Sequence, residues 1–246
     1  MIPYERQERI LQFLTDKDLV KIDEIHAQLP EFSLSTLRRD LKSLESNGKI
    51  EYLIGGGVKA IASIGEIPMT KKTALHSTEK QVIAERAAGL VQDGESVYID
   101  SGSNGTLLLK RLLDRPVTIY TTNTTIFSVN TPIQAKVMML GGQYIPSISS
   151  LSGTLTENTL RDLYFDRAFL GVNGVDDQNG VTTPNIAEAT KKRLIKKNSK
   201  QTYLLCDSSK FHRTATVRAF DLDGVTLISD KSDHDLGQLV PILIPE

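Results

Sequence analysis

The sequence has few of the features that assign a chain to a specialised class. It contains one cysteine, Cys206, which excludes an intramolecular disulfide and a cysteine-based zinc cluster. Its formal net charge is −1, so the overall electrostatics favour neither nucleic acid nor a membrane as partner. It has no run of about 18 apolar residues, and Glu5 and Arg6 interrupt any N-terminal signal sequence. We therefore expect a cytoplasmic protein without a membrane span.

The remaining composition is that of an ordinary globular protein. The chain has 246 residues, of which 39% are hydrophobic and 24% are charged. This length is sufficient for one large domain or two smaller ones.

Residues 1–60 carry three short helical patterns followed by a hairpin. The first helix begins near Pro3, Asp23 caps the second and Pro30 ends it, and Ser33 caps the third. Two short apolar strands on either side of a glycine-rich turn then form a hairpin. This order predicts a winged helix-turn-helix.

The third helix has one apolar and one polar face. Leu34, Leu37, Leu41 and Leu44 follow each other at helical spacing and face a core. In a winged helix-turn-helix this helix enters the major groove of DNA, where short polar side chains and arginine contact bases. The residues that we expect to contact DNA are Ser33, Ser35, Thr36, Arg38, Arg39, Lys42 and, in the wing, Tyr52.

The charge of this region limits how tightly a single copy can bind. Residues 1–60 contain one more acidic than basic residue, so we expect weak non-specific binding by one head. Two heads on one DNA would restore affinity. We therefore predict a homodimer or homotetramer on double-stranded operator DNA.

The chain divides into residues 1–58 for DNA binding, a linker at 59–76 broken by Gly65 and Pro68, and an effector domain at 77–246. Thr78 and Gln81 form a capping-box pattern at the start of the effector domain. Strands are expected at 96–100, 117–121, 136–140, 166–170, 202–206 and 225–229, and helices at 105–113, 124–131, 153–163 and 187–198. This alternation predicts an α/β fold in three layers, with a mostly parallel sheet between helices.

Small polar residues follow most of the expected strands, and the ends of parallel strands meet at one edge of a sheet, where ligands bind. The stretch 98–112 runs from a strand through a glycine-containing loop into a helix, whose first N–H groups attract anions. The predicted effector-binding residues are Asp100, Ser101, Gly102, Ser103, Asn104, Gly105, Thr106, Asn123, Gly141, Gly142, Asn173, Gly174, Asp176, Glu188, Asp207 and Lys210.

Two cofactor classes do not fit this loop. A P-loop requires Gly-Lys-Ser/Thr, which is absent. A dinucleotide fold requires G-x-G-x-x-G and an acidic residue after the next strand, but that strand is followed by Asn123. We therefore expect no cofactor and a small phosphorylated ligand, with Lys210 near the phosphate and Asp100, Asn123, Asp176, Glu188 or Asp207 at its hydroxyls. Asp100, Glu188, Asp207 and Lys210 also leave open an enzyme that isomerises or deaminates phosphosugars.

Three other features have simpler interpretations. The basic run Lys191, Lys192, Arg193, Lys196 and Lys197 is interpreted as a solvated helix face. Cys206 is assigned to the core. His212 lies near the proposed edge, but a single histidine with no evident partner does not indicate a site.

The stretches "LSTLRRDLKSLESNGKI", "IDSGS", "TTN", "LGG", "FDRAFLGVNGVDDQNGVTT" and "LLCDSSKF", in this order over nearly the whole chain, resemble the DeoR family of bacterial transcription regulators. The resemblance implies a winged helix and a sensor domain with the fold of ribose-5-phosphate isomerase and glucosamine-6-phosphate deaminase. It also implies a sugar-phosphate effector from the regulated pathway, and most members are repressors released by it.

Two stretches depart from the family pattern. In the wing, Glu51, Tyr52 and Ile54 stand where the family usually has an Arg and a His. The family loop reads Gly-Ser-Thr-Thr, where this chain has Asn104 and Gly105 after Gly102-Ser103. We expect the ligand class to survive this change because the backbone N–H groups remain.

Overall fold

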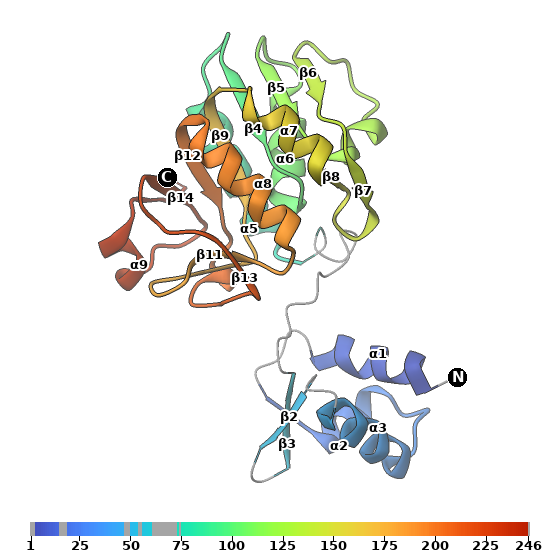
Figure 1. Cartoon of the computed structure of the whole chain (residues 1–246). Helices are drawn as coiled ribbons and strands as arrows, with labels where there is room; N and C mark the ends of the chain where they lie inside the picture. The colour runs from blue at the N-terminus through green and yellow to red at the C-terminus, as the bar shows by residue number, and fades with distance from the viewer. Residues whose placement is uncertain are drawn as a thin grey trace. The chain divides into compact units, whose positions relative to one another are not determined.

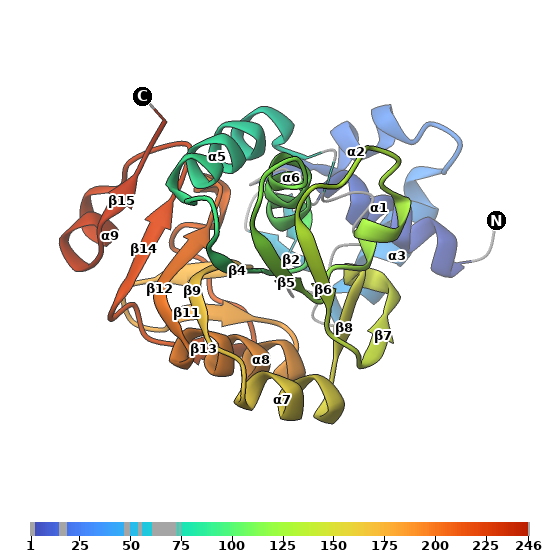
Figure 2. The ribbon, with the colours of Figure 1, turned by 90° about the horizontal axis from the view of Figure 1, so that it is seen from above.

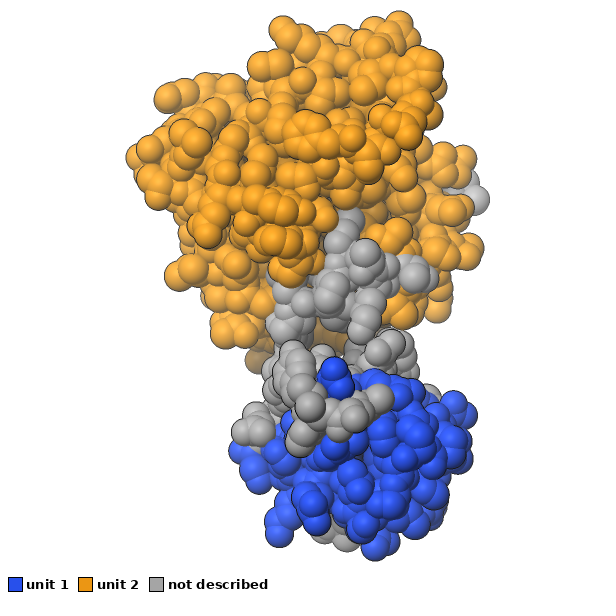
Figure 3. Space-filling view, turned by 90° about the vertical axis from the view of Figure 1, so that its right-hand side faces the viewer, with its two compact units in different colours: residues 1–65 blue, residues 66–246 orange. Residues whose placement is uncertain are grey.

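The computed structural model describes residues 3–14, 19–46, 50–53, 56–60, 73 and 75–245. The chain forms two compact units, residues 1–65 and 66–246, whose ribbons are shown in Figure 1 and whose surfaces are coloured separately in Figure 3. The division falls inside the stretch that the sequence assigned to a linker. Strand β3 extends to Ala60, past residue 58.

The first unit is a winged helix-turn-helix, as the sequence predicted. Its strands form an antiparallel sheet in the order β1-β3-β2. Three buried leucines of α3, Leu37, Leu41 and Leu44, pack with the other helices, while Leu34 is half-buried. The elements are α1 (Pro3–Leu14), β1 (Val20–Lys21), α2 (Ile22–Gln28), α3 (Leu34–Ser46), β2 (Ile50–Leu53) and β3 (Gly57–Ala60).

The two predicted caps in this unit have different outcomes. Ser33 caps α3, because its Oγ accepts a hydrogen bond of 3.2 Å from the Thr36 amide. The prediction for Asp23 was wrong: α2 begins at Ile22 after Lys21, so Asp23 lies in the first turn, where a carboxylate favours the helix dipole. The predicted end of the third helix at Asn47-Gly48 lies outside the described residues.

An ion pair fixes α3 against α1. Arg6 donates from Nε and Nη2 to the two carboxylate oxygens of Asp40, at 2.8 and 3.1 Å. Asp40 is buried and follows directly after Arg38 and Arg39. The pair therefore holds α3 against α1 through two hydrogen bonds to one carboxylate.

The second unit is built on a seven-stranded sheet in the order β15-β14-β12-β9-β4-β5-β6, in which every pair is parallel. Helices α5 and α6 cover one face, and α7 and α8 cover the other (Figure 2). The strands are β4 (Ser96–Ile99), β5 (Thr118–Thr121), β6 (Lys136–Met139), β9 (Phe165–Gly171), β12 (Ser199–Leu205), β14 (Val225–Ile228) and β15 (Ile242–Leu243), and the helices are α5 (Ser77–Leu90), α6 (Ser103–Leu112), α7 (Thr154–Arg161), α8 (Ile186–Lys197) and α9 (His234–Leu239).

The apolar strands are continuous because both faces of the sheet are covered. In β4, Val97 and Ile99 pack with α5 and α6, whereas Tyr98 packs with Phe165 on the face of α7 and α8. The predicted α/β fold in three layers, with its parallel strands, is confirmed.

Several smaller elements differ from the prediction. Helix α5 begins at Ser77 without a side-chain cap, so the capping box at Thr78 was wrong. The expected helix at 124–131 is a short 3-10 helix, η1 (Thr124–Ser128), capped by Asn123. The antiparallel elements were not predicted; they are the hairpin β7 (Gln143–Ile145) and β8 (Ser150–Ser152), which flank η2 (Pro146–Ile148), and the sheet of β10 (Gly174–Asp176), β11 (Gly180–Thr183) and β13 (Val217–Phe220).

Candidate functional site

The first half of α8 carries a buried group of charged residues. The interpretation of its basic run as a solvated face was wrong for two of its members: Lys191 is fully buried and Lys192 is 4% exposed. Arg193 and Lys197, in contrast, are exposed. The two lysines point into the carboxyl edge of the sheet, where the predicted site lies.

Asp100 lies close to both lysines. It follows β4 directly and is fully buried. Its Oδ2 accepts from Lys192, and its Oδ1 lies 3.9 Å from the Lys191 ammonium. The amides of Ser101 and Gly171 also donate to the carboxylate, at 2.9 and 3.3 Å. A buried carboxylate with two cations and two amides as partners is a fully paired group.

Lys191 holds the second acidic residue in place. Its ammonium donates to Glu188 Oε1 at 2.8 Å, Ser150 Oγ at 2.9 Å and Thr122 Oγ1 at 3.0 Å. An ammonium has three N–H donors, so these oxygens use its capacity. Lys191 therefore ties α8 to β8 and to the end of β5. Asp100, Glu188, Lys191 and Lys192 are hereafter called the charged cluster.

The charged cluster shifts the pKa of one of its members, Asp100, and that of a neighbour, Tyr98. Burial opposes the ionisation of Asp100, but Lys192 and Lys191 outweigh it and lower the pKa of this carboxyl below its usual value. The neighbouring Tyr98 is fully buried. Burial and the nearby Asp100 charge raise the pKa of Tyr98 well above its usual value, so this phenol stays neutral.

The loop before α6 begins directly after Asp100 of the cluster. Gly102 has φ +106°, and a Cβ added there would meet no atom within 4 Å. The first amides of α6, Ser103 to Gly105, have no acceptor within the helix. The Thr106 amide, which we had included in the predicted phosphate contact, donates to the Gly102 carbonyl at 2.9 Å. The available N–H groups are therefore those before Thr106.

Gly105 and Asn104, where the loop departs from the family pattern, have distinct roles. A Cβ at Gly105 would lie 2.0 Å from the Asp100 carbonyl oxygen, so only glycine permits this packing of α6 on the end of β4. Asn104 donates from Nδ2 to Leu205 O at 3.3 Å. Its Oδ1 is a buried acceptor without a hydrogen-bond partner among the described residues.

The structure brings some of the other predicted residues to this edge in a structural role. Ser101 Oγ donates to Ser150 Oγ at 2.8 Å, and Asn123 Nδ2 donates to Thr106 Oγ1 at 2.9 Å. Asp207 and Lys210 follow β12, in and beside the 3-10 helix η3 (Ser208–Lys210); Asp207 is buried and Lys210 is half-buried.

Other predicted residues serve turns or close packing. Asp176 accepts from the amides of Gln178 and Asn179 at 2.9 and 2.6 Å, which closes the β10–β11 turn. A Cβ at Gly174 would lie 2.1 Å from Arg213 O, and one at Gly142 would lie 2.1 Å from Thr156 Oγ1. The prediction that these three residues contact the ligand is not supported by contacts with the cluster. Asn173 accepts from Thr183 Oγ1, and Gly141 is exposed after β6.

His212 has a partner that the sequence did not reveal. Its Nε2 lies 2.9 Å from Asp233 Oδ2, at the start of α9. This hydrogen bond and the nearby acidic charges raise the pKa of His212. Cys206 is buried in the core as predicted, and burial raises the pKa of its thiol well above the usual value.

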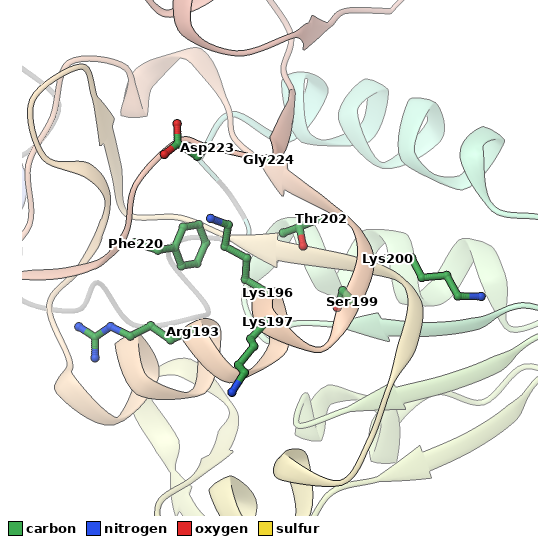
Figure 4. A pocket seen from close by; sticks show the side chains of 9 residues that line it. All are labelled: Arg193, Lys196, Lys197, Ser199, Lys200, Thr202, Phe220, Asp223 and Gly224. Atoms are coloured by element: carbon green, nitrogen blue, oxygen red, sulfur yellow. The ribbon is translucent and has the colours of Figure 1, made fainter.

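A separate open pocket of about 410 Å³ lies at the opposite edge of the sheet, at the amino ends of β12 and β14 (Figure 4). Three of its four cations already have protein partners: Arg193 donates to the carbonyls of Arg218 and Ala219, Lys200 pairs with Asp166, and Lys196 lies over the Phe220 ring. We therefore assign no ligand to this pocket.

In the first unit, the predicted DNA-reading side chains lie on one side of α3. Ser35, Arg38, Arg39 and Lys42 are exposed, as is Ser33, and Thr36 is half-buried. Tyr52 differs, because its ring packs partly against the core of this unit. Burial and Glu45 raise the pKa of Tyr52 against the opposing effect of Arg38, so any contact from Tyr52 to DNA would use its hydroxyl end.

A winged helix joined to a parallel α/β domain is the architecture of a DNA-binding transcriptional regulator with a sensor domain. Residues 6–63 match the DeoR-like helix-turn-helix domain, and residues 75–231 match the DeoR C-terminal sensor domain. The chain therefore belongs to the DeoR family of transcriptional regulators, and its resemblance to that family is confirmed.

Curated relatives agree with this assignment. The uncharacterized HTH-type transcriptional regulator FruR of Bacillus subtilis is 30% identical, over 95% of this chain and 93% of that protein. The L-fucose operon activator of Haemophilus influenzae is 29% identical, over 94% and 93%. The putative aga operon transcriptional repressor of Escherichia coli O157:H7 is 29% identical, over 91% and 84%. These relatives are named regulators and not enzymes.

Among solved structures, a ribose 5-phosphate isomerase from Methanocaldococcus jannaschii matches with a TM-score of 0.41 and 17% identity, over 55% of each chain. Within the described residues, no helix is both long and apolar enough to cross a membrane, and no three His, Cys, Asp or Glu side chains are grouped to hold a metal ion.

Proposed function

We propose that this regulator is a repressor of a sugar-metabolism operon, and that a phosphorylated sugar bound beside the charged cluster releases it from its operator. The observation that carries the proposal is the open space at Gly102, at the N-terminus of α6 and next to Asp100. A relative named as an L-fucose operon activator supports the choice of a sugar-derived ligand.

The residues at this edge suit the two ends of such a ligand. The amides of Ser103 to Gly105 would bind the phosphate, with Lys210 supplying charge. The unpartnered Oδ1 of Asn104 would accept from a sugar hydroxyl. Glu188, whose Oε1 accepts from Lys191, would accept from another hydroxyl through Oε2. Lys191 is a positioning residue because its donors already have acceptors.

The first test is a thermal-shift screen of the full chain against sugar phosphates, each paired with its unphosphorylated sugar and with inorganic phosphate. A ligand that binds only the folded chain stabilises it by RT ln(1 + [L]/Kd), about 2.7 kcal/mol at 100 Kd. We expect a sugar phosphate to raise the melting temperature. The unphosphorylated sugar and inorganic phosphate should each raise it much less. If no compound in the screen raises the melting temperature, the proposed ligand class is contradicted.

A pair of lysine variants tests the location of the site. Lys210→Met should raise the Kd of the identified compound about tenfold, by the loss of one charge-assisted hydrogen bond. Lys110→Met, at the exposed far end of α6, should leave the Kd unchanged. Equal Kd values for the two variants would place the phosphate elsewhere.

The direction of control is tested with DNA selected from a random pool by the wild-type protein. Adding the identified sugar phosphate should weaken binding to this DNA. Stronger binding would indicate an activator-like response, and turnover of the compound would indicate an enzyme.

A further inference from the structure

One end of the sensor sheet is almost free of charge. Between Arg115 and Glu157 the sequence has a single charged residue, Lys136, whereas 24% of the whole chain is charged. This segment forms β5, β6, the β7–β8 hairpin and the start of α7. Strand β6 and the hairpin lie on the side of the unit opposite α9 in both ribbon views (Figures 1 and 2). The exposed residues of segment 116–156 are hereafter called the uncharged surface.

Contacts join the parts of this surface into one region. The amide of Leu151 donates to Thr122 O at 3.0 Å, which attaches β8 to the end of β5. Thr156 Oγ1 donates to Gly141 O at 2.6 Å, and Leu155 packs against the same glycine directly after β6. The hairpin, the end of β6 and the start of α7 therefore meet around Gly141.

The uncharged surface also exposes large apolar side chains. Phe127 is 76% exposed, Leu155 is 64% exposed and Tyr144 is 52% exposed. Exposed aromatic and aliphatic groups without charges between them are the composition of an interface core. A monomer would gain solubility from charges at these positions.

Strand β6 is the edge of the sheet. Its one strand neighbour in the described sheet is β5, and Met138 on it is 39% exposed. Monomeric proteins protect such an edge with charges or a covering element. Lys136 is the one charge that β6 carries.

We propose that the uncharged surface binds a second copy of this chain through the same surface. In a two-fold interface a patch meets itself, so any net charge on it would face a like charge. Two copies of a nearly neutral, apolar surface can pack together without electrostatic repulsion. A charged partner would meet no opposite charges on this surface. The near-neutral DNA-binding unit independently requires two heads on one DNA.

The test measures the mass of the full chain by sedimentation velocity at micromolar concentration, without DNA or sugar phosphate. The outcome is therefore independent of the effector proposal. The wild-type chain should sediment with at least twice the mass of one chain. The double variant Tyr144→Asp, Leu155→Asp should sediment at a lower mass, with the dissociation constant raised at least about 100-fold, because like charges brought face to face are strongly unfavourable.

A matched control carries the same change at the opposite end of the sheet. Leu239→Asp, Ile244→Asp replaces side chains that are 54% and 43% exposed, near α9 and β15, and should keep the wild-type mass. Circular dichroism melting checks that both double variants fold. If the Tyr144→Asp, Leu155→Asp variant does not fold, Phe127→Asp replaces it as the surface variant. The proposal is overturned if the wild-type chain sediments with the mass of one chain. It is also overturned if the folded surface variant keeps the wild-type mass, or if the control variant loses as much mass as the surface variant.

Discussion

Helices α3 and α8 each carry a pair of adjacent basic residues, Arg38–Arg39 and Lys191–Lys192. On α3 both arginines are exposed, and the buried charge beside them is Asp40, held by Arg6 of α1. On α8 both lysines are buried and held by Asp100 and Glu188. Adjacent basic residues are thus exposed to solvent in one unit and part of the core in the other.

The difference lies in what the neighbouring elements supply. A buried ammonium is tolerated when a carboxylate and hydroxyls complete its hydrogen bonds. The ends of β4, β5 and β8 provide these groups to α8, whereas no acidic residue faces the exposed side of α3 among its described contacts. A basic run therefore acquires its role from the strands and loops that it faces.

The largest expected effect comes from breaking the buried pairing. Asp100→Ala leaves Lys192 without its carboxylate in a buried site, and removing one partner of a buried ion pair costs about 3–5 kcal/mol. We expect this loss in the free energy of unfolding, measured by urea denaturation of the full chain with circular dichroism.

The control is an exposed pair in the same unit. Asp93→Ala removes the partner of Arg115, and Asp93 is 62% exposed. Its loss should stay below about 1 kcal/mol. Equal losses for Asp100→Ala and Asp93→Ala would show that the charged cluster is not a buried ion-pair network.

A smaller effect, on binding and not on stability, is expected from α3. Arg39→Ala should weaken binding to the selected DNA by about 1–3 kcal/mol if its guanidinium reads a base edge. Arg38→Ala should weaken binding to all sequences and reduce the salt dependence by about one ion. Gel-shift titrations measure both, with Arg111→Ala in the sensor unit as control. Wild-type affinity in both α3 variants would exclude this helix as the reader.

The smallest expected effect concerns pH. The pKa of His212 is raised by Asp233, so the ion pair stabilises the fold at pH values below the unfolded histidine pKa of about 6.5. This contribution disappears as pH rises through the raised pKa of the folded state. The melting temperature of His212→Gln should therefore fall below that of the wild type at pH 5.5 and match it at pH 8.5. A constant difference between the two proteins at both pH values would contradict this assignment.

The sequence predicted the parts of the fold that depend on regular spacing. The leucine stripe of α3 and the apolar strands around Asp100 and Asn123 were placed correctly because both depend on one repeating pattern. Short antiparallel elements such as β7 and β8 have no such pattern over three residues, and they were missed.

Of the charged cluster, Asp100 and Glu188 were among the predicted residues, whereas Lys191 and Lys192 were not. Glu188, Lys191, Lys192 and Ile195 have the i, i+3, i+4, i+7 spacing of a buried helix face, and this spacing was the available signal. The basic composition of the run concealed it. The ligand contacts predicted for Gly142 and Gly174 stay predictions; the sequence did not show that these glycines lie close to Thr156 Oγ1 and Arg213 O.

The pairing of charges inside the sensor unit has a consequence for ionic strength. Buried ion pairs are poorly screened by salt, whereas contacts between exposed arginines and DNA phosphates weaken steeply as salt rises. Moderate salt should therefore detach the protein from DNA while the charged cluster stays intact. Affinity for the proposed effector can then be measured on the free protein at moderate salt and on the DNA complex at low salt. The comparison separates effector binding from DNA binding in one preparation.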